Sequence, residues 1–403
     1  MVRRHNIAHT FVLGAVLALS ASAQGVQEHV WIDIHGPPKG SVQRLPVAIV
    51  EVSGVVGAGR PHYHDLAIVL DLSVSTRLPS GVDVDSDGHL GRSSPEIRED
   101  YWGSAAPELL CDDADDTIAA AELAAVRRLL SLLDPRLTRV ALIAFGDRGL
   151  IEAPLESTRE EVLAALAVLD GKHGWYGGTN YSAGLRAAVR ALLDAPQAGD
   201  RDRKRSILFL SDGYPTMPLP EPLPAQEAVA AARETAQAGV HVHGFALGPE
   251  GIRGREIFEL IARLSRGTTT EIARPGDILF HLPSVELSEI AEVVVRNDTS
   301  GEAGRAVRLF ADGSFDGFVP LQPGRNLLRV SATGVGGASA SVVREVFYDP
   351  PGRPTRELEL EVDRLRDLIR NRTVEVELTT EIRRAREQRR EALRKRLKVW
   401  PEN

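Results

Sequence analysis

The stretch Leu66-Ala-Ile-Val-Leu-Asp-Leu-Ser-Val-Ser-Thr-Arg77 joins an apolar run to a polar end. Five consecutive apolar residues, 66–70, are typical of a strand that is buried on both faces. Three oxygen-bearing side chains follow at alternate positions: Asp71, Ser73 and Ser75. Their spacing at the end of a buried strand indicates a site for a ligand that prefers hard oxygen donors.

Length and composition restrict the class of protein. With 403 residues the chain is long enough for two or three domains that each have a core. A hydrophobic content of 43% and a charged content of 26% are ordinary for a soluble globular protein. The net charge of −8 argues against a general nucleic-acid-binding protein, which would carry a basic surface.

Residues 1–23 have the pattern of an export signal peptide. Arg3 and Arg4 precede the apolar segment FVLGAVLALS, and Ala21-Ser-Ala23 fits cleavage before Gln24. The apolar segment is too short to span a bilayer, and no other stretch reaches about 18 apolar residues. We therefore expect an exported protein without a transmembrane segment that is secreted, periplasmic or associated with the cell surface.

Residues 62–282 alternate between strand-like and helix-like segments. The expected strands are 66–70, 140–145, 206–210, 240–247 and 268–273, and the expected helices are 117–133, 159–169, 183–193, 224–239 and 255–265. Such alternation favours an α/β fold with a doubly wound, mainly parallel, Rossmann-like sheet that has helices on both faces.

The flanks of this region show only strand patterns with Gly, Asp and Pro turns. In residues 283–350 the short strand-like segments predict an antiparallel β-sandwich, and 29–40 and 47–54 are strand-like as well. The segment DGSFDGFVPLQPGRNLLRVSATG, 312–334, resembles bacterial immunoglobulin-like repeats, whose opening strands occur here only within 24–60. Because insertions succeed where chain ends lie close together, we expect the α/β domain to be inserted into one split sandwich.

Residues 354–403 are rich in Arg and Glu. Leu358, Val362, Leu365 and Ile369 follow a helical spacing, whereas 374–378 (VEVEL) alternates like a strand. We expect a charged and mostly helical segment, which is either solvated or used for self-association.

Two further polar signals fall at corresponding places in the α/β region. GGTN puts Thr179 in a glycine-rich loop before a helix, and LFLSDG puts Asp212 at the end of a buried strand. Ligands of open parallel sheets bind outside the carboxyl ends of the strands. Two carboxylates and three hydroxyl groups there would suit Mg²⁺; the alternative is that these residues are caps and turns.

The segments DLSVS, GGTN and LSDG resemble the three parts of the metal-ion-dependent adhesion site of von Willebrand factor A (VWA) domains. This resemblance covers residues 62–282 and assigns Asp71, Ser73, Ser75, Thr179 and Asp212 to a site for Mg²⁺ or Mn²⁺. It implies that a partner protein supplies an acidic side chain to the cation.

An acidic insert, 77–116, separates the first motif from the first helix, which follows the motif closely in the family. Between 83 and 116 it has 11 acidic residues and two arginines. Asp83, Asp85, Asp87 and the carbonyl group of His89 fit the first half of a calcium loop, but Ser94 replaces the bidentate acid. One of Asp112, Asp113, Asp115 and Asp116 could replace that ligand, so a Ca²⁺ site and a solvated loop in which Asp115 or Asp116 caps the helix both remain open.

These observations favour an exported, non-enzymatic protein-binding or adhesion module. A metal-dependent hydrolase is the alternative, although no His or Glu lies in the three motifs to act as a general base. A structural scaffold with a vestigial site is the third hypothesis.

Overall fold

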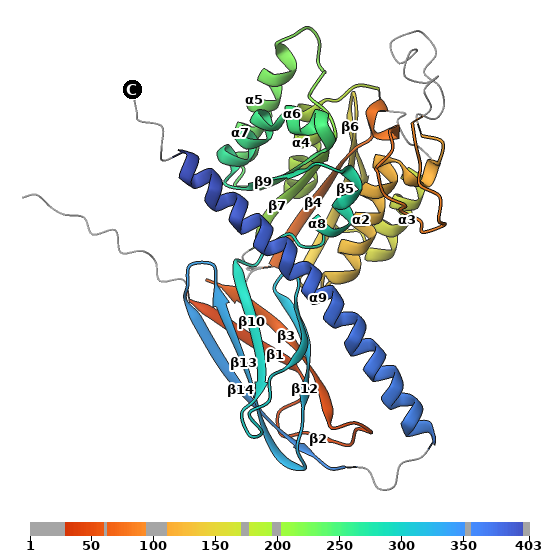
Figure 1. Cartoon of the computed structure of the whole chain (residues 1–403). Helices are drawn as coiled ribbons and strands as arrows, with labels where there is room; N and C mark the ends of the chain where they lie inside the picture. The colour runs from red at the N-terminus through yellow and green to blue at the C-terminus, as the bar shows by residue number, and fades with distance from the viewer. Residues whose placement is uncertain are drawn as a thin grey trace, which may run out of the picture.

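The computed structural model describes residues 29–59, 63–93, 111–170, 177–195, 203–350 and 356–397 (Figure 1). The expected signal peptide and part of the acidic insert, 94–110, lie outside these ranges. Within them, no helix combines the length and the apolar character that crossing a membrane requires.

A six-stranded sheet forms the centre of the α/β part. Its strands, in spatial order, are β6 (Gly149–Ala153), β5 (Thr138–Phe145), β4 (Tyr63–Asp71), β7 (Arg203–Ser211), β8 (His241–Leu247) and β9 (Thr268–Ile272). All neighbouring pairs are parallel except β5 and β6, which form an antiparallel hairpin at one edge. The apolar run of the first motif thus forms β4, near the middle of the sheet.

Alternate residues of β4 belong to two apolar cores. Leu66, Ile68 and Leu70 lie in one cluster, whereas Ala67 and Val69 lie in the other. The first cluster contains α2 (Ile118–Leu132), α3 (Arg159–Asp170) and α8 (Ile278–His281). The second contains α4 (Tyr181–Leu193), α5 (Leu223–Gln237) and α7 (Arg255–Ser265), and the short α6 (Gly248–Arg253) follows β8. Helices therefore cover both faces of the sheet, and the α/β class is confirmed.

Two four-stranded sheets enclose the third apolar core. One has the order β1 (Val30–Gly36), β3 (Ile49–Ala58), β12 (Ser314–Pro320), β11 (Arg305–Leu309), and the other β10 (Ile290–Asn297), β13 (Gly324–Gly334), β14 (Ser339–Tyr348), β2 (Val42–Gln43). The register of β3 and β12 pairs Val55 with Ser314 and Ile49 with Pro320. Strands that precede the α/β part in the chain and strands that follow it therefore share one sheet and one core.

The amino ends of the parallel strands face the β-sandwich. Asp312 accepts hydrogen bonds from the backbone N–H of Asp134 (2.7 Å) and from the hydroxyl of Thr138 (3.2 Å), at the start of β5. The Leu287 N–H donates to the carbonyl of Ala311 at the same junction. The carboxyl ends of the strands consequently point away from the sandwich (Figure 1).

The C-terminal segment is one continuous helix, α9 (Arg356–Leu397). The strand-like alternation of 374–378 is contained in this helix, and the Thr373 and Thr379 hydroxyls donate to the carbonyl groups four residues before them. Val362, Leu365 and Ile369 are half-buried, as their helical spacing predicts.

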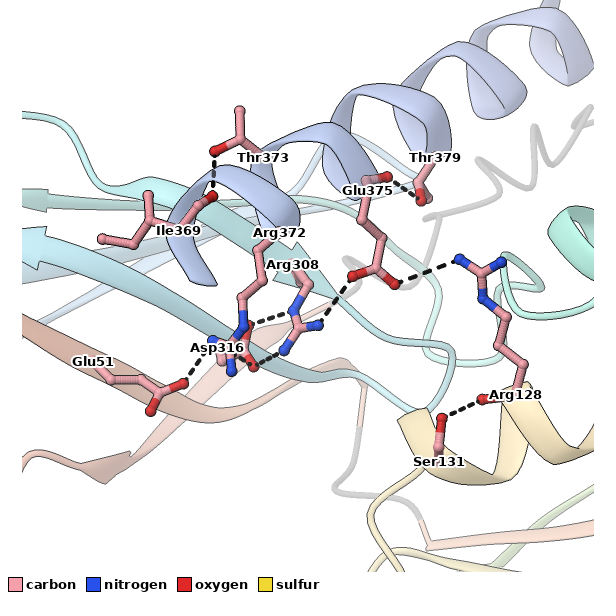
Figure 2. A network of polar contacts seen from close by, with 10 residues as sticks. All are labelled: Glu51, Arg128, Ser131, Arg308, Asp316, Ile369, Arg372, Thr373, Glu375 and Thr379. Carbon is pink, nitrogen blue, oxygen red and sulfur yellow. Dashed lines mark hydrogen bonds and ion pairs between the residues drawn. The ribbon is translucent and has the colours of Figure 1, made fainter. Parts of the chain in front are cut away.

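A polar network fixes α9 to both parts of the molecule (Figure 2). Arg372 lies 2.8 Å from Glu51 of β3 and 3.5 Å from Asp316 of β12. Glu375, one turn later, lies 3.2 Å from Arg308 of β11 and 3.7 Å from Arg128 of α2. The helix therefore bridges the sandwich and the helical layer of the α/β part.

Candidate metal centre

The pairing of β4 with β7 places the first and third motifs side by side. Because both strands are parallel and end at the same edge of the sheet, Asp71 and Asp212 come together there. Asp71 is completely buried and Asp212 is 5% exposed. Two carboxylates with so little access to water need either protons, hydrogen-bond donors or a cation.

Hydroxyl groups link the two carboxylates. The Ser75 hydroxyl donates to Asp212 Oδ1 at 2.9 Å, and it lies 3.1 Å from Ser73 Oγ. The Ser73 N–H donates to Asp71 Oδ1 at 2.8 Å because the chain turns there into a short 3₁₀ helix, η1 (Val74–Arg77). The structure thus brings together the four residues of these two motifs that the sequence predicted.

The GGTN loop adds Thr179 to this group. A Cβ atom on Gly213 would lie 3.6 Å from Thr179 Oγ1 and 3.8 Å from Ser75 Oγ, so the two hydroxyls face the same space beside Gly213. The Thr179 backbone is held by Thr216, whose hydroxyl accepts from the Thr179 N–H at 3.0 Å. All five predicted residues therefore meet at one edge of the sheet.

Glycine at position 177 is required by the shape of this loop. Its φ of +74° lies in the left-handed region, and a Cβ atom would come within 2.3 Å of Asp147 Oδ2. Asp147 Oδ1 accepts from the Gly178 N–H at 2.8 Å, which fixes the loop. Asn180 caps α4 by accepting from the Ala183 N–H.

Burial and mutual repulsion dominate the electrostatics of the two aspartates. Burial raises the pKa of Asp71 to about 6, against the hydrogen bonds from Ser211 and Ser73, which lower it. Burial, followed by the charge of Asp71, raises the pKa of Asp212 to about 8. A divalent ion would remove both penalties, and a set of carboxylate and hydroxyl oxygens is one that Mg²⁺ accepts. The donor set therefore fits Mg²⁺ or Mn²⁺.

The acidic insert brings its first three aspartates together. Oxygen atoms of Asp83, Asp85 and Asp87 all lie within 4.8 Å of one another. The Gly88 N–H donates to Asp83, and the His89 N–H donates to Asp87 at 2.7 Å. The loop thus has a compact turn, while Ser94, at the position of the missing bidentate acid, lies outside the described residues.

Two later aspartates of the insert, Asp112 and Asp116, accept hydrogen bonds from backbone N–H groups. Asp116 is completely buried and accepts from the N–H groups of Val84 (2.6 Å) and Gly91 (2.7 Å), and Asp112 accepts from the Arg92 N–H. Capping of α2 by Asp115 or Asp116 is wrong: the hydroxyl of Thr117 accepts from the Ala120 N–H. Asp116 instead joins the two halves of the insert.

The sequence reasoning missed two residues beside the site. Ser211, which precedes Asp212, donates a short hydrogen bond to Asp71 Oδ2. Glu122 of α2 is completely buried, and burial, then Asp71, then Asp212 raise its pKa well above the usual value. A signal for Glu122 was present: it lies three residues after Ala119 and four before Val126, on the apolar stripe of its helix.

Residues 111–214 match the family described as the von Willebrand factor type A domain. The match covers about a quarter of the chain; it includes Thr179 and Asp212 and begins after the first motif. It supports a domain of this type, which is typical of protein-interaction modules. A comparison with curated proteins finds no match.

Solved structures with some similarity include bacterial proteins of several kinds. BatB from Bacteroides thetaiotaomicron is 17% identical, with 54% of this chain and 94% of that chain covered and a TM-score of 0.36. An aerotolerance-related membrane protein from Bacteroides fragilis is also 17% identical, with 54% and 96% covered and a TM-score of 0.35. The PilB minor pilin from Streptococcus sanguinis is 11% identical, with 62% and 76% covered and a TM-score of 0.37.

Proposed function

We propose that this chain is an exported protein-binding module of the adhesion type. A divalent cation, Mg²⁺ or Mn²⁺, would be held at the carboxyl edge of the sheet and would bind an acidic side chain of a partner protein. The observation that carries the proposal is the convergence of buried Asp71 and Asp212 with the hydroxyls of Ser73, Ser75 and Thr179. The match to a von Willebrand factor type A domain supports it.

Each residue has a distinct part in this proposal. Ser73 and Ser75 would coordinate the cation directly through hydroxyl oxygens, and Thr179 would do so directly or through water. Asp71 and Asp212 would balance the charge and accept hydrogen bonds from the serines and from bound water. A cation so held keeps a position for a carboxylate from outside, and we assign no catalytic residue to the site.

The same proposal covers the architecture around the site. We interpret the α/β part as a doubly wound VWA domain, and the strands on both sides of it as one immunoglobulin-like sandwich into which that domain is inserted. The register of β3 with β12 supports this interpretation. The site lies at the edge of the sheet remote from the sandwich, so the sandwich does not cover it.

Calorimetric titration of Mg²⁺ into wild type and Asp71→Asn tests the site. Asn keeps an oxygen that accepts from the Ser73 N–H, and its amide group can donate to the Ser211 hydroxyl in place of accepting from it. Because the charge is removed, cation binding should be lost while the fold remains. The melting temperature in chelator should be unchanged or higher, because repulsion between Asp71 and Asp212 is relieved. Equal Mg²⁺ affinity of the two proteins would exclude this site.

Recovery of a partner from an extracellular extract tests the function. Wild-type protein in Mg²⁺ should retain a partner that chelator releases, and Asp71→Asn should retain none. Because coupling is reciprocal, the purified partner should raise the affinity for Mg²⁺ by the same factor by which Mg²⁺ raises the affinity for the partner. A partner bound equally well in chelator would contradict a cation-bridged contact.

A further inference from the structure

The carboxylate of Glu122 is buried in an apolar cluster and has no donor within the described part of the protein. Its side chain has no exposed surface, and neither Oε1 nor Oε2 has a hydrogen-bond partner among the residues that the structure describes. The neighbouring positions on its face of α2, Ala119, Ala125 and Val126, are completely buried apolar residues. An ionised carboxylate in such a place costs several kcal/mol, so Glu122 either holds a proton or is compensated by a cation that is not part of the polypeptide.

Glu122 lies close to the edge where the cation residues meet. The start of α2 is attached to the segment after the first motif, because the Ile118 N–H donates to the carbonyl of Leu78 and Thr117 bridges to Pro79. Glu122 follows one turn later, and its helical neighbours Ala119, Ala125 and Val126 belong to the same apolar cluster as Leu70, Leu72 and Leu210. These leucines flank Asp71 and precede Asp212 in the chain.

Electrostatics indicate that the three acids act on one another. Asp71 and Asp212 are the charged groups that raise the pKa of Glu122 after burial itself. Burial is also the first cause for the raised pKa values of Asp71 and Asp212. Three buried carboxylates in one place would repel strongly, and a positive charge among them would stabilise all three.

We propose that Glu122 is a further residue of the cation site, which supports the cation from the apolar side of α2. Its carboxylate accepts hydrogen bonds from water bound to the cation and adds a third negative charge to those of Asp71 and Asp212. It is a positioning residue, because it acts through water and charge and makes no contact with the partner. This inference rests on the proposed cation site and extends the set of residues that form it.

Glu122→Gln and Glu122→Met test the proposal, with Mg²⁺ affinity measured by calorimetry and melting temperature measured in Mg²⁺ and in chelator. Gln keeps the shape without the charge, and Met fills a similar volume without polar atoms. We expect both to weaken Mg²⁺ binding by about 10- to 100-fold, the usual effect of removing an outer carboxylate. In chelator Glu122→Met should melt at or above the wild-type temperature, because a buried polar group without a partner is gone, and Glu122→Gln should melt close to it.

Leu123→Val is the matched control, since Leu123 is the next residue of the same helix and equally buried. It should lower the melting temperature by the same amount in Mg²⁺ and in chelator and leave Mg²⁺ affinity unchanged. Wild-type Mg²⁺ affinity in both Glu122 variants would overturn the proposal while leaving the cation site intact. If neither Glu122 variant folds, Glu122 has a structural role and the proposal is overturned as well. If the wild type does not bind Mg²⁺, this proposal and the proposed function are both overturned.

Discussion

Ser75 donates a hydrogen bond of 2.9 Å to Asp212, although the two residues are 137 positions apart in the chain. A hydroxyl group has one proton and two lone pairs, so Ser75 can keep this bond while its oxygen faces a cation. The contact thus holds the first and third motifs together without a cation, and in the proposed site it would orient Asp212 before the cation binds.

Ser75→Ala should weaken Mg²⁺ binding at least about tenfold, because it removes both a ligand oxygen and the donor that orients Asp212. Calorimetric titration measures this effect, and the melting temperature in chelator should change little since Ser75 is only half-buried. Ser131→Ala on the exposed surface of α2 is the control and should bind Mg²⁺ like the wild type. An unchanged affinity of Ser75→Ala would remove Ser75 from the set of ligands.

The stability of the cation-free protein should fall as the pH rises from about 4 to about 8. In the unfolded chain an aspartate ionises near its ordinary pKa of 3.8, whereas the pKa values in the folded protein are about 6 for Asp71 and about 8 for Asp212. The folded state therefore binds more protons in this range, and the stabilisation present at low pH is lost as these groups ionise.

Melting temperatures in chelator and in Mg²⁺ across this pH range test the dependence. Because Mg²⁺ stabilises the ionised groups and competes with protons, the gain from Mg²⁺ should grow with pH. Asp212→Asn, which cannot ionise, should show a flatter curve in chelator. A Mg²⁺ gain that is constant with pH would argue against these aspartates as the groups that bind the ion.

Ca²⁺ should protect the acidic insert from proteolysis if Asp83, Asp85 and Asp87 bind it. Their oxygens lie within 4.8 Å of one another, and a divalent ion would relieve the repulsion and fix the loop. Limited digestion in Ca²⁺ and in chelator, followed by mapping of cuts within 77–116, measures this. Asp83→Asn with Asp85→Asn should abolish the protection; identical cutting of wild type in both conditions would speak for a solvated loop.

Asp316→Ala should destabilise the protein by about 1.5–3 kcal/mol, the range for hydrogen bonds to charged groups. Asp316 accepts from Arg308 and lies near Arg372, so its loss leaves two poorly exposed cations without that acceptor. Chemical denaturation measures the change. Asp363→Ala removes an acid from an exposed pair with Arg366 on the same helix and should cost almost nothing. Equal effects of the two would show that α9 is not anchored through Asp316.

Residues 284–350 alone should not unfold cooperatively. Without 29–59 the strand β12 loses its neighbour β3, and the shared core loses Val50, Val52 and Val56. Joining 29–59 to 284–350 by a flexible linker should restore a cooperative transition, which circular dichroism during heating would detect. Stable folding of 284–350 by itself would contradict the split sandwich.

The strands and motifs could be predicted because the residues that define each of them are neighbours in the sequence. The run 66–70 formed β4, and Asp71 and Asp212 met because parallel neighbours end at one edge. Glu122 was missed because its place on the apolar stripe of α2 indicates burial but does not indicate which residues it approaches. The bonds from Asp116 to Val84 and Gly91 span 32 and 25 positions and leave no pattern in the sequence. The segment 374–378 alternates like a strand but is helical, as expected for 354–403 as a whole, because its helical neighbours on both sides continue one hydrogen-bond ladder through it.

The orientation of β4 has a mechanical consequence. Its first residue lies at the junction with the sandwich and its last is Asp71, so a partner pulling on the site would load this strand along its length, over roughly 26 Å. Hydrogen bonds to β5 and β7 on both sides would then be sheared together instead of opened one after another. Because the chain enters the α/β part after β3 and leaves it before β10, tension would divide between two connections into the sandwich. If the proposed adhesion function holds, this layout would resist a partner that pulls on the site.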